Sequence, residues 1–155
     1  MSEQPASSEH GGRTLKRAAL WLVWIHFLVV ALHSIAHEVL AVKASAAQLA
    51  FIVPVIIVAP VVAGVMLPKF KRAGASVLMA SMIGSFVFGL YYHFVADTGD
   101  HVAHVAHLRP AAWAAMFHIT AYLLAVSEAL GAAAAVLLTA GRPQPFKHYA
   151  ARTDF

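Results

Sequence analysis

Long apolar segments separated by short polar ones fill most of this chain. Four segments have the roughly 20 residues of apolar sequence that cross the hydrocarbon core of a bilayer. They are residues 18–42, 46–67, 75–95 and 110–139. We predict that each is a transmembrane helix, because a helix satisfies its backbone hydrogen bonds within one segment. The expected fold is an all-α integral membrane protein, a four-transmembrane-helix bundle over residues 13–142.

The polar positions outside these segments predict the ends and the irregular points of the bundle. Residues 1–12 are small and polar and indicate a disordered tail, and residues 143–155 form a second tail. Pro54 and Pro60 lie inside the second segment, where we expect them to bend the helix and neighbouring groups to satisfy the carbonyls they free. Pro110 suits the first turn of the fourth helix.

Composition supports a membrane protein and excludes several kinds of chemistry. Of the 155 residues, 61% are hydrophobic and 12% are charged, whereas soluble domains are nearer half apolar and a quarter charged. The chain has no cysteine. Disulfides, thiolate metal sites and cysteine nucleophiles are therefore excluded.

The net charge of +4 is explained by membrane topology. Lys43 and Arg109 lie in the first and third connections. The other basic residues precede the first segment, fill the second connection or follow the fourth segment: Arg13, Lys16, Arg17, Lys69, Lys71, Arg72, Arg142, Lys147 and Arg152. Because cytoplasmic loops carry the excess of Lys and Arg, we predict that both termini are cytoplasmic, in a bacterial inner (plasma) membrane. Nucleic-acid binding is not indicated.

Histidines gather at the end of the bundle that is predicted to face outward. His33 and His37 are an i, i+4 pair on the first segment, a spacing that lets two imidazoles bind one ion. Together with His26 they fall within about 40° of one another around the helix. His93 ends the third segment, and His118 lies about two turns into the fourth from the same side.

The connection between the third and fourth segments, YYHFVADTGDHVAHVAHLRP, adds further candidate ligands. Gly99 argues against one unbroken helix. Asp97 as N-cap and Asp100 at the third helical position predict instead a short amphipathic helix on the outer face, in which Asp100 and His104 are an i, i+4 pair. Capping of this helix is the structural alternative for both aspartates. Simple solvation is the alternative for His101, His104 and His107.

These residues predict a transition-metal site near the outer face. The preferred ligands come from the helices: His33, His37, His93 and His118. Further ligands, or groups that orient them, are expected from the connection: Asp97, Asp100, His101 and His104. Imidazole suits copper, iron and zinc, and mixed imidazole and carboxylate ligation suits iron, zinc or Cu(II) better than Cu(I).

One short motif has a counterpart in a known family. Asp100-x3-His104, followed by His118 on the next helix, resembles the aspartate and paired-histidine copper motif in the third subunit of particulate methane and ammonia monooxygenases. In that family the second histidine comes one residue earlier, and the subunit is longer and has more spans. The resemblance covers residues 100–118. It implies copper, and a subunit of a membrane oxidoreductase or monooxygenase.

Two other functions are compatible with the same residues. A b-type haem needs one axial histidine on each face, which His33 or His37 opposite His93 or His118 could supply. A cluster of histidines that titrate near neutrality could instead make a proton-coupled or pH-sensing module.

Two further features bear on proton movement and on assembly. His26 and Glu128 lie on the inner half of the bundle and could form a proton relay or a structural bridge. The alanine- and glycine-rich fourth segment, which allows close helix approach, favours an accessory subunit whose partners are the lipid bilayer and other membrane subunits.

Overall fold

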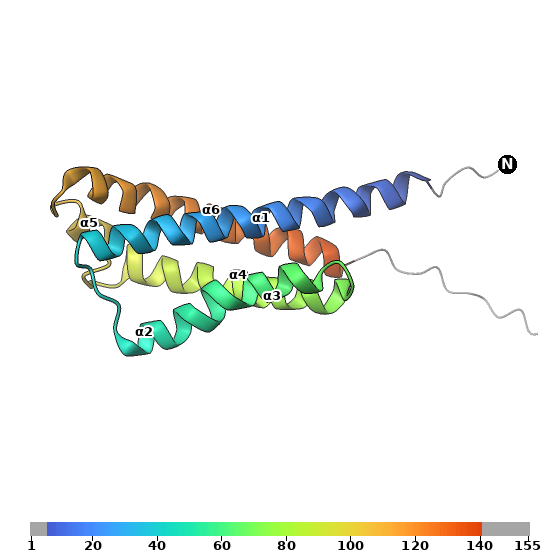
Figure 1. Ribbon diagram of the computed structural model, residues 1–155, viewed down its shortest axis with the longest axis horizontal. Coiled ribbons are helices and arrows are strands. Elements are labelled where there is room, and N and C mark those ends of the chain that lie inside the picture. Colours follow the sequence, from blue (N-terminus) through green and yellow to red (C-terminus); the bar gives the residue numbers. More distant parts are fainter. Residues whose placement is uncertain (1–5, 141–155) are drawn as a thin grey trace, which may run out of the picture.

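The computed structural model describes residues 6–140, and within that range it contains helices and no strands. The helices form four long stretches. The first is α1 (Ala6–Val39), and the second consists of α2 (Ala46–Phe51), the π-helical η1 (Ile52–Val58) and α3 (Ala59–Met66). The third consists of α4 (Lys71–Leu90) and the π-helical η2 (Tyr91–Val95), and the fourth is α6 (Ala111–Thr139). A short helix, α5 (Val102–Val105), lies between η2 and α6 (Figure 1). The four stretches are long and apolar enough to cross a membrane, which confirms the predicted helical class and the predicted number of helices that could span one.

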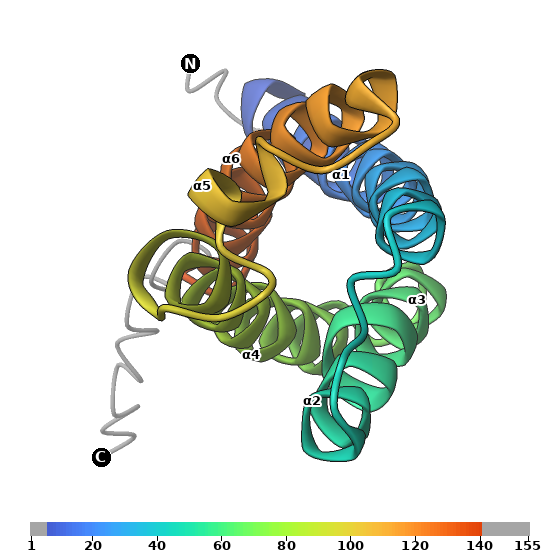
Figure 2. The same cartoon turned by 90° about the vertical axis from the view of Figure 1, so that its left-hand side faces the viewer.

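The four stretches run alternately up and down and form a ring in cross-section (Figures 1 and 2). α6 packs against both α1 and α4, α3 packs against α4, and a smaller contact between α1 and α3 closes the ring. Large apolar side chains such as those of Trp21, Leu28 and Val65 are exposed on the outside of the ring. An exposed apolar surface of this extent suits contact with lipid rather than with water.

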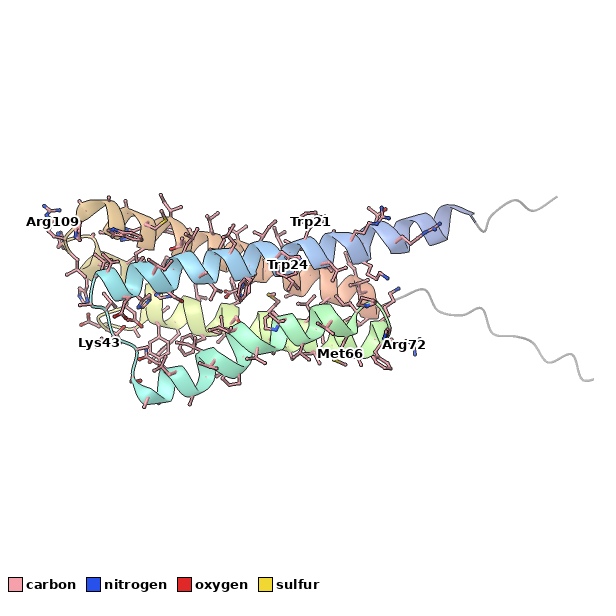
Figure 3. The ribbon with its side chains drawn as sticks, viewed as in Figure 1. Trp21, Trp24, Lys43, Met66, Arg72 and Arg109 are labelled. Carbon is pink, nitrogen blue, oxygen red and sulfur yellow. The ribbon has the colours of Figure 1, made fainter. Side chains whose placement is uncertain are left out.

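The basic residues separate between the two ends of the ring. Figure 3 shows Arg72 at one end and both Lys43 and Arg109 at the other. The N-terminal part of α1 lies at the same end as Arg72 (Figures 1 and 3). This separation is the one that the charge pattern predicts. Which end faces the cytoplasm stays a prediction.

The N-terminal boundary differs from the prediction. α1 begins at Ala6, so residues 6–12, which the composition indicated as part of a disordered tail, are helical. The long apolar helix that follows supplies the nucleus, and adding a residue to an existing helix costs far less than starting one. Residues 1–5 and the predicted tail at 143–155 lie outside the described residues.

The C-terminal end of α1 is a Schellman turn, which stops the helix at Val39 rather than at Val42. The N–H of Val42 donates to the His37 carbonyl (2.9 Å) and the N–H of Ala41 donates to the Glu38 carbonyl (3.1 Å). Ala41 takes the left-handed conformation, with φ of 54°, where glycine is the usual residue. The turn folds Val42 back over the last turn of α1, close to His37.

The carbonyl that Pro60 frees in the second stretch is satisfied by a neighbouring helix, as predicted. Residues 52–58, around Pro54, form a π-helical segment, and Pro60 follows in the first turn of α3. Pro60 has no N–H to offer the carbonyl of Ile56, four residues earlier. His26 on α1 donates to that carbonyl instead, from Nε2 at 3.1 Å.

The connection between η2 and α6 lies at the end of the ring opposite the N-terminal part of α1, the end predicted to face outward (Figure 1). α5 is the short helix predicted there, but its N-cap is His101, whose Nδ1 accepts from the N–H of Ala103 (3.2 Å), so the prediction of Asp97 as N-cap is wrong. After Asp97 the chain bends at Thr98 and makes one turn, in which the N–H of His101 donates to the Thr98 carbonyl (3.1 Å), before helical geometry begins. Val105 of α5 is fully buried beside Phe117 of α6, in one apolar cluster with residues of α1.

Candidate metal centre

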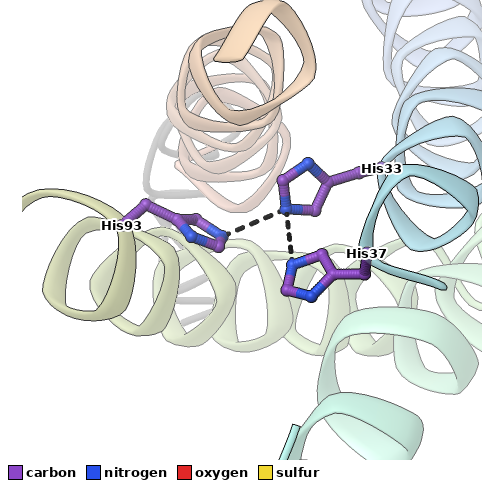
Figure 4. A group of neighbouring side chains, drawn as sticks. All are labelled: His33, His37 and His93. Atoms are coloured by element: carbon purple, nitrogen blue, oxygen red, sulfur yellow. Dashed lines mark hydrogen bonds between the residues drawn. The ribbon is translucent and has the colours of Figure 1, made fainter. Parts of the chain in front are cut away.

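Three imidazoles from two helices meet inside the half of the ring that is predicted to face outward (Figure 4). His33 and His37 come from successive turns of α1, and His93 comes from η2, the π-helical end of the third span. The Nε2 atom of His33 lies 3.2 Å from that of His37 and 3.3 Å from that of His93. Their candidate ligand atoms all lie within 4.8 Å of one another, so the three side chains could hold a single metal ion.

The opposite nitrogen of each ring is tied to an oxygen atom. Nδ1 of His37 lies 2.9 Å from the carbonyl of Val42, which the Schellman turn places there. Nδ1 of His93 lies 3.1 Å from the Asp100 carbonyl. Nδ1 of His33 lies 2.8 Å from Oγ1 of Thr120, and that hydroxyl donates its own proton to the carbonyl of Met116 (2.7 Å). The hydroxyl therefore accepts from His33.

The carbonyl contacts fix the tautomers of His37 and His93, and the Thr120 hydroxyl fixes that of His33 when its proton is donated to a backbone carbonyl. A carbonyl, or a hydroxyl whose proton is already donated, can only accept, so each Nδ1 carries the proton. In the neutral ring Nε2 then bears the lone pair, and three lone pairs point toward one region. Metal-binding histidines in proteins are oriented in this way, with the second ring nitrogen donating to a carbonyl, a carboxylate or water.

The short distances between the Nε2 atoms suit a shared cation. A hydrogen bond between two of these atoms needs a second proton on one ring, and one proton serves only one of the two contacts drawn in Figure 4. A metal ion would serve all three rings. A tetrahedral ion with bonds of about 2.0–2.1 Å separates its ligand nitrogens by about 3.3–3.4 Å, close to the two distances from His33, and the third distance lies within the 4.8 Å bound of the group.

The group has one closed side and one open side. The ring of Phe117, which is fully buried, packs against all three imidazoles, with ring centroids 4.6 Å from His33, 4.9 Å from His37 and 5.4 Å from His93. On the other side the imidazoles line a cavity of about 460 Å³. A bound ion would therefore have room for a further ligand on the cavity side.

The other ligands predicted from the helices and the connection make separate contacts. His118 lies with Nε2 2.6 Å from the Val102 carbonyl, which holds α5 against α6. His104 contacts the Thr98 carbonyl through Nδ1 (2.8 Å) and the exposed carboxylate of Asp97 through Nε2 (3.2 Å). His101 caps α5. None of these joins the group formed by the helix histidines.

Asp100 takes part through its backbone. Its buried carboxylate accepts from the amide of Gln48 (3.1 Å), while its carbonyl accepts from His93. Asp100, His104 and His118, the residues of the copper motif that the connection resembles, thus have different partners and do not converge.

His26 and Glu128, the predicted relay pair, have separate surroundings in the structure. Nε2 of His26 donates to Ile56 across the ring, and its Nδ1 has no hydrogen-bond partner. No hydrogen bond or ion pair between His26 and Glu128 is found within residues 6–140. Glu128 instead lines the same cavity as the three histidines. The relay stays a prediction.

Sequence reasoning missed three parts of this centre: the Thr120 hydroxyl, the Val42 carbonyl and the Phe117 ring. Thr120 offered a weak signal as a polar residue in an apolar helix. The other two offered none, since one is a backbone group and the other an ordinary apolar residue.

Comparison with known proteins gives no further guide: the chain matches no protein-family model, no curated protein and no solved structure.

Removing the hydroxyl that orients His33 tests the tautomer argument. We expect Thr120→Val, which keeps the shape of the side chain, to weaken metal binding by about tenfold to a hundredfold, the usual effect of losing a group that orients a ligand. Metal titration of the purified protein measures it. Ser127→Ala is the matched control, because Ser127 is a buried hydroxyl on the same helix that bonds only to the Leu124 carbonyl. Equal affinities in the two variants would contradict the assignment.

Proposed function

We propose that this protein is a small membrane metalloprotein that binds one transition-metal ion through Nε2 of His33, His37 and His93. One observation carries the proposal: all three rings are held by Nδ1, while Nε2 of His33 lies 3.2 Å and 3.3 Å from those of His37 and His93 and all three candidate ligand atoms lie within 4.8 Å of one another. The sidedness of the basic residues supports an outer-face position in a bacterial inner membrane with both termini cytoplasmic.

The ligand set bears on the choice of metal. Three imidazoles and an open position suit zinc, copper or iron. The carboxylates of Asp97 and Asp100 lie outside the group, bound to His104 and Gln48. The argument from mixed ligation against Cu(I) therefore loses its basis, and copper in either oxidation state is compatible with the site.

The open side supports an ion that reacts or exchanges ligands over a purely structural one. Structural zinc sites are closed by four protein ligands, whereas sites that react or exchange ligands keep a free position. The small size of the chain and the exposed apolar surface of its helices support a role as an accessory or redox subunit of a larger membrane complex.

The geometry favours a non-haem metal over b-type haem. His33 and His37 are on one helix face with their Nε2 atoms 3.2 Å apart, so they cannot lie on opposite faces of one macrocycle. A haem between His33 and His93 would have to part atoms now 3.3 Å apart and displace the ring of Phe117. A metal ion needs neither change.

Elemental analysis and an absorption spectrum of the protein purified in mild detergent test the proposal. We expect about one equivalent of copper, iron or zinc per chain, retained through dialysis or restored by titration, and no Soret band. A Soret band with one haem per chain would overturn the non-haem assignment. Folded protein that binds neither would overturn metal binding and leave the histidines as a proton-sensing cluster.

A further inference from the structure

Glu128 is a buried acid that the three-histidine centre does not use. Only 2% of its surface is exposed, and it lies within the membrane-spanning part of α6. Within residues 6–140 its carboxylate has no hydrogen bond and no ion pair. An unpaired carboxylate in a bilayer is costly and marks a functional position by default.

The cavity joins Glu128 to the three histidines. Both line the same space of about 460 Å³, and Glu128 forms no hydrogen bond with any of the imidazoles. Gly89 lies between them on α4. A methyl group at Gly89 would lie 3.8 Å from Oε2 of Glu128 and 3.9 Å from Cδ2 of His93. The space beside Gly89, where another residue would have a side chain, thus lies between the Glu128 carboxylate and the His93 ring.

Within residues 6–140, Glu128 forms no ion pair with a positive side chain. The three Nε2 atoms are acceptors, and so are the oxygens of an ionised Glu128. Ser85, which also lines the cavity, has a buried hydroxyl without a hydrogen-bond partner. The charged side chains Glu38, Lys43 and Asp100 also line the cavity, and none of them forms a hydrogen bond or an ion pair with Glu128 within residues 6–140. A metal ion held by neutral imidazoles alone would bring its whole charge into an apolar interior.

We propose that Glu128 supplies the negative charge of the metal site. The acid holds a proton while the site is empty and releases it as the metal binds. The reaction is one hydrated divalent ion and one neutral acid giving one bound ion, one carboxylate and one proton in solution, with no change of oxidation state. The net charge that enters the bilayer is thereby reduced by one. This inference rests on the proposed three-histidine site.

Counting protons during metal binding tests the inference. The probe is zinc, titrated into detergent-purified wild type and into Glu128→Gln in weakly buffered solution with a pH indicator, and by calorimetry in buffers of different ionisation enthalpy. We expect the variant to release about one proton fewer per zinc and to bind zinc at least about tenfold more weakly, because it loses a charge attraction inside a low-dielectric site. Protons from the histidines are common to both proteins and cancel in the difference.

Two further variants define the controls. Glu128→Asp keeps a carboxylate and should restore the missing proton. Glu38→Gln removes an exposed carboxylate that lines the same cavity, and should release as many protons as wild type. Infrared difference spectra of the wild type alone should show a protonated carboxyl band that disappears when zinc is added, so the test does not depend on the folding of any variant.

The outcomes separate the two proposals. Zinc that binds the wild type while Glu128→Gln releases the same number of protons, or an unchanged carboxyl band, overturns the role of Glu128 and leaves the three-histidine site standing. Failure of the wild type to bind zinc, copper or iron overturns the site itself.

Discussion

Replacing His33 by alanine is expected to abolish stoichiometric metal binding. His33 is the central ring: its Nε2 contacts the Nε2 atoms of both His37 and His93. For comparison, a structural zinc site with a full set of protein ligands is worth roughly 10–16 kcal/mol in apparent binding free energy at neutral pH. Losing one of three protein ligands should therefore weaken binding by at least about a hundredfold. Elemental analysis after dialysis and competition with a chelator of known affinity measure the change.

Two comparisons separate loss of a ligand from loss of structure. His118→Ala removes a histidine that bonds only to the Val102 carbonyl and should retain metal like the wild type. Free imidazole should partly restore binding to His33→Ala by occupying the space left by the ring. Full metal retention by His33→Ala would refute the assigned centre, whatever the result for His118.

Replacing Phe117 by alanine is expected to cause the largest loss of stability. The ring is fully buried and packs against three imidazoles and the apolar cluster at the outer end. Removing a buried phenylalanine side chain costs about 3–5 kcal/mol, through lost contacts and the cavity left behind. We expect the unfolding free energy to fall by about that amount, measured by reversible denaturation in mixed micelles.

A residue two positions away supplies the comparison. Ile119 lies on the same helix with 57% of its surface exposed, and Ile119→Ala should change the unfolding free energy by no more than about 0.5 kcal/mol. Phe117→Leu should recover part of the loss. Equal effects of the two alanine variants would mean that the ring of Phe117 does not support the histidine cluster.

The architecture could be predicted from the sequence because the length and hydropathy of an apolar segment are enough to identify a candidate membrane helix. The four apolar segments match the four spans to within a few residues except at the N-terminal end of α1. The prolines of the second segment also acted as the physics of unpaired carbonyls predicts, with His26 taking the carbonyl that Pro60 leaves free. These conclusions needed only local sequence.

The three helix histidines of the site could be predicted from the sequence, but the partners of the histidines in and after the connection between η2 and α6 could not. His33 and His37 share a helix face, and His93 ends a span on the same side, so spacing and topology were enough to bring them together. The partners of His101, His104 and His118 depend on the path of the chain between residues 96 and 110, which spacing does not determine. In this stretch Nδ1 of His104 contacts the Thr98 carbonyl and Nε2 of His118 contacts the Val102 carbonyl. These two histidines therefore bond to the backbone and do not join the three helix histidines.

The ligands of the proposed ion also belong to parts of the ring that make little direct backbone contact. α1 packs mainly on α6, and the third span packs on α6 and α3, whereas the imidazoles of α1 and η2 meet at the centre. A bound ion is then a cross-link that ties two sides of the bundle at its outer end. By thermodynamic linkage, anything that draws α1 and η2 together, including a neighbouring subunit, strengthens metal binding by the same factor by which the metal strengthens that association.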